Sequence, residues 1–293
     1  MENTRAKTTR NSLILLLTAT IWGMAFVSQS KGMDYMHPFT FNGVRSLIGA
    51  AGILVYILIS RKIAGDKAAK LDWKLNVRAG LLCGIFLTIA STLQQFGIKY
   101  TSVGKAGFIT TLYIIFVPMF GVFLKKKVAP VVWAAAGMAA VGMYLLCMTE
   151  SLRLGAGDIM VFLCAIAFAI QIMTVDHYAA RIDGAVVSCI QFTVCGVVCC
   201  IGALIWGQPT FGQIQEGLGA LLYAGVLSCG VGYTLQIVGQ KGLNPTVAAL
   251  IMSLESVIAT ISGWIAYKIG FLSTDQTPVS YTHLRAHETG RNL

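Results

Sequence analysis

The sequence predicts an all-α membrane protein that crosses the bilayer many times. Apolar residues make up 56% of the chain and charged residues only 12%, about half the charged share of ordinary soluble domains. The charge-free stretches recur at lengths close to the ~20 residues with which a helix crosses a hydrocarbon core. A β-barrel would show ~10-residue alternating segments instead. A soluble bundle would need charged outer faces, and residues 106–124 carry no charge on any face.

Reading from charge to charge gives the candidate spans in order. Each is long enough to cross the membrane as one helix. They cover residues 11–30, 38–60, 79–98, 106–124, 128–149, 159–175, 184–206, 217–240 and 245–267. Nine spans are therefore expected.

The distribution of Lys and Arg predicts the orientation, because positively charged connections stay on the cytoplasmic side. With the N-terminus inside, the inner connections hold most of these residues, including runs at 61–78 and 125–127. The outer connections hold only Lys31, Lys99, Lys105, Arg153 and Lys268. We expect a multi-pass protein of the bacterial inner membrane with a cytoplasmic N-terminus. The positively charged cytoplasmic connections then account for the net charge of +10, and no nucleic-acid partner is expected.

An internal repeat gives the domain organisation. A shift of 142 positions superimposes Gln94 on Gln236 and Lys99 on Lys241, without gaps across two spans, and 38–45 falls near 183–191. The unit recurs after five spans, an odd number, so the second unit enters the membrane with the opposite orientation. Inverted repeats of this kind are typical of secondary transporters. We expect two inverted five-helix units, a ten-span plan of which nine spans are present.

The predicted units span residues 11–149 and 154–276, and the second lacks its last helix. Composition changes abruptly near Thr277, and residues 277–293 crowd His283, Arg285, His287 and Glu288 into a polar tail. We interpret this tail as foreign sequence that replaces a tenth span. A genuine polar terminus is the alternative.

From about residue 12 to residue 276 the chain resembles the EamA type of the drug/metabolite transporter superfamily. The likeness is carried by 19–26 (ATIWGMAF), 38–45 (PFTFNGVR), 105–124, 157–169 and 244–264. It implies a fold of two inverted five-helix units and a function in moving small metabolites. The chain departs from the pattern at Ser256, where the family usually has proline after Leu-Glu, and in its missing tenth span.

Two ionisable residues lie deep within the predicted spans, where charges are costly and usually functional. Glu255 is ~15 Å from the inner end of its span and Arg45 ~10 Å from the outer end of its own, so they can sit at similar depths. Our hypothesis is that Arg45 holds an anionic group of the solute and that Glu255 binds a proton or a cationic group. A static Arg–Glu pair that joins the two units is the alternative.

Polar side chains in the spans extend this candidate site. We expect Trp22, Gln94, Tyr113, Gln191 and Gln236 to bind substrate, Gln191 because it falls near the repeat counterpart of Arg45. Hydrogen bonding between helices is the alternative for each. Gly80 and Gly84 have the spacing of close helix packing, within the chain or in a homodimer. Pro118 predicts a kink in its span, used in gating or static.

The absence of catalytic motifs from the sequence argues against an enzyme. No metalloprotease, hydrolase or phosphate-loop motif occurs, the cysteines lie within apolar spans without ligand spacing, and no metal or cofactor is expected. The sequence therefore predicts a permease, not an enzyme: a secondary transporter that exports small polar metabolites such as amino acids by alternating access, coupled to protons. A channel or a membrane scaffold that does not transport is the alternative. A channel would be expected to show rings of like charge, which one Arg and one Glu within the spans do not suggest.

Overall fold

The structure is a computed structural model that describes residues 2–65, 71–124, 130–131, 133–135, 137–138, 141–142 and 155–272. Its described residues form helices and no strands, which confirms the all-α class. Eight helical stretches are long and apolar enough to cross a membrane, and they match eight of the nine predicted spans. The predicted fifth span, 128–149, lies largely outside the described residues, as does the predicted tail.

In the first half of the chain, polar caps and prolines set where the helices begin. The helices are α1 (Glu2–Gly32), α2 (Pro38–Ala64), α3 (Trp73–Ile98), α4 (Val103–Thr110) and α5 (Tyr113–Phe123). Asp72 accepts a hydrogen bond from the amide of Leu75 at the start of α3, and Ser102 accepts one from the amide of Lys105 in α4. Each cap satisfies an amide that would otherwise lack a partner.

The second half follows the same rules. It contains α7 (Ala156–Tyr178), α8 (Gly184–Gly202), the π-helical η2 (Ala203–Gly207), α9 (Phe211–Glu216), α10 (Leu218–Leu222), the π-helical η3 (Tyr223–Gly232), α11 (Tyr233–Gln240), α12 (Pro245–Met252) and α13 (Glu255–Lys268). Asp183 caps α8 and Asn244 caps α12, with Pro245 at the first helical position, where its missing N–H costs nothing.

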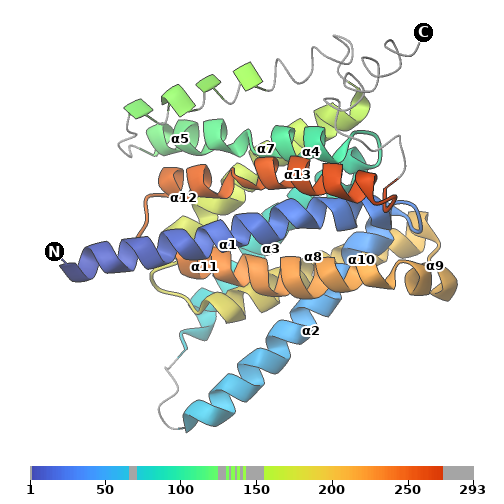
Figure 1. The fold of residues 1–293 in the computed structure, drawn as a ribbon. Coiled ribbons are helices and arrows are strands. Elements are labelled where there is room, and N and C mark those ends of the chain that lie inside the picture. Colours follow the sequence, from blue (N-terminus) through green and yellow to red (C-terminus); the bar gives the residue numbers. More distant parts are fainter. Residues whose placement is uncertain are drawn as a thin grey trace.

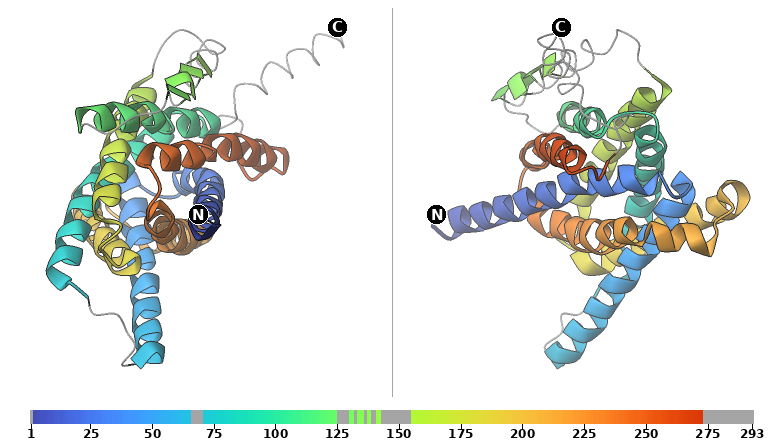
Figure 2. Two further views of the ribbon diagram at one scale, coloured as in Figure 1. Left: turned by 90° about the vertical axis from the view of Figure 1, so that its left-hand side faces the viewer. Right: turned by 45° about the vertical axis from the view of Figure 1, so that its right-hand side comes forward.

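Neighbouring helices come from both halves of the chain. α2 packs along α8, α3 packs on α7 and α8, and α1 packs on α13, η3 and α11. Figure 1 shows α1 running between the α12–α13 pair and the η3–α11 stretch, and the views of Figure 2 show the second part of α2 projecting from the bundle. Large apolar side chains such as Leu58 and Phe211 are exposed on the outer faces, as a lipid-facing surface requires.

The glycines of α3 act in packing within the chain. A β-carbon at Gly80 would lie 2.6 Å from the Ile190 β-carbon, and one at Gly84 would lie 2.9 Å from that of Val194. Only glycine lets α3 and α8 approach this closely. The packing interpretation of these two residues is thereby confirmed.

Candidate functional site

Two membrane-spanning helices are broken near their middles. A turn at Thr111 and Leu112 separates α4 from α5, and a turn at Ser253 and Leu254 separates α12 from α13. The two breaks are 142 residues apart, the distance of the sequence repeat. Backbone hydrogen bonds bridge both turns, from the Thr111 amide to the Gly107 carbonyl at 3.2 Å and from the Ser253 amide to the Ala249 carbonyl at 2.9 Å. Discontinuous helices within the membrane often line a binding site.

The break in the first unit lies before Pro118, which sits inside α5. The kink predicted at this proline is therefore not the interruption of the span. The interruption falls at Thr111 and Leu112, so that Tyr113 opens α5, as Glu255 opens α13. Residues at equivalent positions of the two units thus begin the second half of each broken helix.

A small internal cavity lies beside Tyr113 and Glu255. Its volume is about 30 Å³, which is room for roughly two water molecules. It is lined by Trp22, Phe26, Gln29, Arg45, Gln94, Thr110, Tyr113, Phe168, Gln171, Ile172, Ser228, Tyr233, Gln236 and Glu255. Both halves of the chain contribute to one site.

The cavity lining repeats with the sequence. Four pairs of lining residues stand 142 positions apart: Phe26 and Phe168, Gln29 and Gln171, Gln94 and Gln236, and Tyr113 and Glu255. Equivalent residues of two units meet at one cavity when the units face each other across it. The inverted relation of the units stays a prediction, and this arrangement supports it.

The structure brings together six of the seven predicted site residues. Trp22, Arg45, Gln94, Tyr113, Gln236 and Glu255 all line the cavity. Gln191 does not; its side chain is fully buried, and neither amide atom has a hydrogen-bond partner among the described residues. The binding roles of all seven stay predictions.

Buried polar atoms without partners converge on the cavity. Among the described residues, no hydrogen-bond partner is present for Trp22 Nε1, Gln29 Oε1, Arg45 Nε, Gln171 Nε2 and Gln236 Oε1. All five belong to lining residues, whereas the Tyr113 hydroxyl and the Glu255 carboxyl group contact each other. An unpartnered buried polar group costs about 1–3 kcal/mol, so this cavity is suited to a polar guest that both donates and accepts hydrogen bonds.

The two intramembrane charges remain separate. Arg45 and Glu255 are 5% and 3% exposed, and no ion pair joins them within the described residues. The Arg45 guanidinium carbon lies 5.4 Å from the centre of the Phe41 ring. A static Arg–Glu pair is thus not formed in this conformation, in which the Glu255 carboxyl group contacts the Tyr113 hydroxyl instead.

Other atoms of the lining amides form hydrogen bonds between helices around the cavity. Gln94 Nε2 donates to Thr110 Oγ1 over 3.2 Å, and Gln236 Nε2 donates to Gln171 Oε1 over 3.2 Å. The rings of Trp22 and Tyr233 pack with centroids 4.5 Å apart. These contacts hold lining side chains from different helices in fixed positions.

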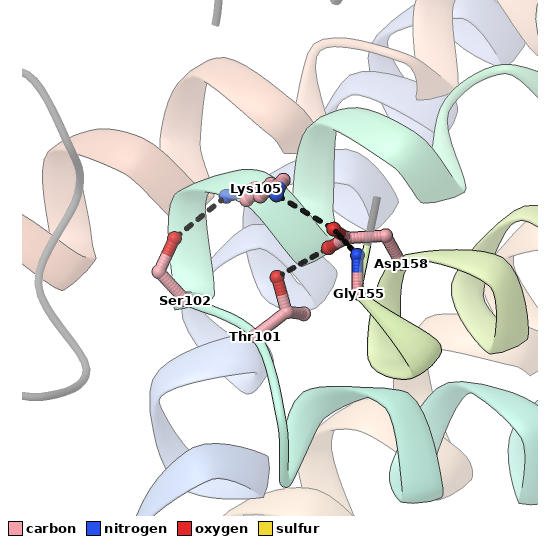
Figure 3. A network of polar contacts seen from close by, with 5 residues as sticks. All are labelled: Thr101, Ser102, Lys105, Gly155 and Asp158. Atoms are coloured by element: carbon pink, nitrogen blue, oxygen red, sulfur yellow. Dashed lines mark hydrogen bonds and ion pairs between the residues drawn. The ribbon is translucent and has the colours of Figure 1, made fainter. Parts of the chain in front are cut away.

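A buried ion pair closes one end of the bundle. Lys105 Nζ lies 2.6 Å from Asp158 Oδ2, while Asp158 also accepts hydrogen bonds from Thr101 Oγ1 at 2.8 Å and from the Gly155 amide at 3.0 Å. We call these residues, with Ser102, the Lys105 cluster (Figure 3). It joins the start of α4 to the start of α7, and sequence reasoning missed it because Asp158 stood at the edge of a predicted span.

Comparison with known proteins gives relatives named as transporters. An uncharacterized transporter of Archaeoglobus fulgidus is 27% identical over 273 residues, covering 91% of this chain and 80% of that protein. The uncharacterized transporter YwfM of Bacillus subtilis is 27% identical over 257 residues, covering 86% and 84%. A solved crystal structure with 16% identity shares the fold, with a TM-score of 0.67 over 93% of each chain.

The family comparison covers both halves of the chain. The EamA-like transporter family matches residues 10–148 and again residues 155–275. Together with the eight membrane-spanning stretches, these matches define an integral, multi-pass membrane protein of the drug/metabolite transporter superfamily. The chain belongs to the EamA-like transporter family.

Proposed function

We propose that this transporter exports small zwitterionic metabolites, of which amino acids are the type, by proton-coupled alternating access. The observation that carries the proposal is the cavity, where one buried cation, one buried carboxylate and five unpartnered polar atoms meet. An amino acid offers a carboxylate to Arg45 and an ammonium group to Glu255. Its two charges match the two that the cavity presents.

The polar lining supports recognition by hydrogen bonds in addition to charge. Trp22 and Gln171 offer N–H groups, whereas Gln29 and Gln236 offer carbonyl oxygens. A bound solute that satisfies these atoms removes the cost of leaving them unpaired. The same lining disfavours apolar solutes, which cannot do so.

The small volume of the cavity favours a carrier over a channel. A volume of about 30 Å³ admits water but no metabolite, so a solute enters only when the surrounding helices move apart. The Lys105 cluster ties α4 to α7 at one end, which the charge distribution predicts to face the outside. Opening there requires this buried pair to separate. The orientation with a cytoplasmic N-terminus, in a bacterial inner membrane, is part of the proposal.

Glu255 is the proposed proton site because it is the buried carboxylate of the cavity. It opens α13 beside Tyr113, and a β-carbon at Gly23 of α1 would lie 2.8 Å from the Glu255 carbonyl oxygen. The backbone of Glu255 therefore lies where α1 and α13 pack closely, while its side chain lines the cavity. Release of a proton here lets the carboxylate bind the ammonium group of the next solute.

The test is counterflow in proteoliposomes. Vesicles that contain the purified protein are loaded with unlabelled amino acids, and a ¹⁴C-labelled amino acid mixture is added outside. A carrier gives saturable, transient accumulation of label, because alternating access accelerates exchange. Linear, unsaturable flux would indicate the channel alternative, and the absence of flux would exclude amino acids as substrates.

Two matched variants connect transport to the cavity. Gln171→Leu removes a lining amide, whereas Gln95→Leu removes an equally buried amide outside the cavity, whose Nε2 donates to the Gln29 carbonyl at 3.1 Å. We expect a loss of exchange in the first that exceeds any loss in the second. In Glu255→Gln, exchange should no longer respond to an imposed pH gradient; an unchanged response would remove Glu255 from the coupling role.

A further inference from the structure

A second, larger cavity lies away from the substrate site, where α2 ends and where α3 and α8 begin. Its volume is about 510 Å³, and we call it the basic vestibule. Three cationic side chains line it: Arg61 of α2, Arg181 before α8, and Lys241 after α11. It lies at the same end of the spans as the N-terminus of α1.

The carboxylates of the basic vestibule are already engaged. Asp72 accepts from the Leu75 amide at 3.0 Å, and Asp183 accepts from the amides of Ala185 and Val186 at 2.9 and 3.2 Å. Both therefore serve as helix caps. Lys241 donates to the Ile182 carbonyl at 3.2 Å and retains two further N–H groups. Arg181 donates to the His177 carbonyl at 3.4 Å. With three cationic side chains against two carboxylates, the described lining carries a net positive charge.

An apolar groove continues from this vestibule along the outer face of the bundle. It has a volume of about 390 Å³ and is lined by residues of α2, η3 and α11, among them Ile53, Val226 and Leu235. Tyr56, Thr234 and Val238 line both the groove and the basic vestibule. The basic vestibule and the apolar groove therefore form one continuous surface.

Glycines keep this groove open. Gly52 lines it, and a β-carbon built there would meet no atom within 4 Å. Gly230, also in the lining, would meet only a backbone oxygen at 3.5 Å. The glycines of α3 allow two helices to touch, whereas Gly52 borders empty space that nothing within the described chain fills.

We propose that the groove and the basic vestibule together bind an anionic phospholipid. An acyl chain lies along the groove between α2 and η3, and the phosphate of the headgroup contacts Arg61, Arg181 and Lys241. Charge complementarity and the continuity of the two surfaces select this occupant. A zwitterionic lipid satisfies the groove but brings no net negative charge, and a free anion leaves the groove empty. Bound there, the lipid bridges α2 to the η3–α11 stretch, so it ties membrane composition to the position of α2.

Native mass spectrometry of the full-length protein tests this site. The detergent-solubilised protein is titrated with dioleoyl phosphatidylglycerol and, separately, with dioleoyl phosphatidylcholine, and bound lipids are counted. We expect one tightly held phosphatidylglycerol. Arg61→Gln with Arg181→Gln should weaken its binding by about 30-fold, from about 1 kcal/mol for each basic residue near the membrane surface. Arg78→Gln, an exposed α3 residue outside the vestibule, is the control and should leave binding unchanged.

A second variant addresses the groove without disturbing the fold. Gly52→Leu fills the groove at a position with free space and should reduce retention of both lipids. Gly219→Leu, also exposed with no atom within 4 Å of its β-carbon, is the control and should not. The proposal is overturned if Gly52→Leu retains the lipid, if both lipids bind equally, or if inorganic phosphate displaces the lipid. It is also overturned if the protein forms a dimer through the groove, shown by a dimer that Gly52→Leu abolishes.

Discussion

Replacement of Lys105 by Met should destabilise the protein substantially, because it leaves Asp158 charged and buried. The side chains of Lys105 and Asp158 are 8% and 4% exposed, and their charged atoms lie 2.6 Å apart. Removing one partner of such a buried pair costs about 3–5 kcal/mol. Asp158 keeps its hydrogen bonds from Thr101 and the Gly155 amide, so we expect a loss near the lower limit, about 3 kcal/mol.

A double-mutant cycle isolates the pair. Asp158→Asn should also destabilise the protein, and the combination Lys105→Met with Asp158→Asn should cost less than the sum, with a coupling of about 0.5–3 kcal/mol for residues in contact. The assay is reversible unfolding in mixed micelles of increasing denaturing detergent, followed by circular dichroism. Additive effects of the two single changes, or a loss below about 1 kcal/mol for Lys105→Met, would refute this account of the pair.

The remaining predictions concern helix packing and pH. Gly97→Ala should destabilise the protein by about 1–3 kcal/mol, measured in the same assay, because its β-carbon would lie 2.8 Å from a backbone oxygen of α7; a change within about 0.5 kcal/mol would contradict the close packing. His37, between the first two spans, has its pKa lowered below 6.5 by burial and by Lys99. The folded state then binds fewer protons than the unfolded state, so stability should fall as the pH drops below about 6.5. His37→Gln should remove this part of the pH dependence of the melting temperature, and an identical profile would rule it out.

The spans could be predicted from the sequence because a helix that crosses the bilayer needs about 20 consecutive, predominantly apolar residues. Length and charge alone placed eight stretches correctly. The breaks inside two of them could not be predicted, because neither Thr111 with Leu112 nor Ser253 with Leu254 carries a glycine or proline signal. Pro118 lies inside α5, and the kink predicted there stays a prediction.

The candidate site was predictable where a rare residue or the repeat marked it. Arg45 and Glu255 were identified by the cost of charge in a bilayer, and Gln94 and Gln236 as polar side chains within apolar spans. The 142-residue shift relates Gln29 to Gln171 and could have added both to the site. Gln191 does not line the cavity and its binding role stays a prediction, because sequence spacing locates its turn of helix but not the direction of its side chain.

The long-range contacts could not be predicted from the sequence. The Lys105 cluster joins residues 53 positions apart at the ends of two spans, and single-chain spacing offers no signal for such a pair. The basic vestibule likewise gathers Arg61, Arg181 and Lys241 from three distant connections. The charge distribution predicts a shared inner location for them, but their convergence on one cavity required the fold.

Accessibility of one cavity residue from the two sides of the membrane tests the central claim most directly. Ser228→Cys is introduced into a cysteine-free background and labelled with a membrane-impermeant maleimide in right-side-out and inside-out vesicles. Alternating access predicts labelling from each side. Cross-linking Lys105→Cys to Asp158→Cys should abolish labelling from the outside and accelerate it from the inside, because it shifts the population towards the inward-open state. Labelling from one side only, or outside labelling that persists after cross-linking, would contradict a single cavity exposed in turn to both sides.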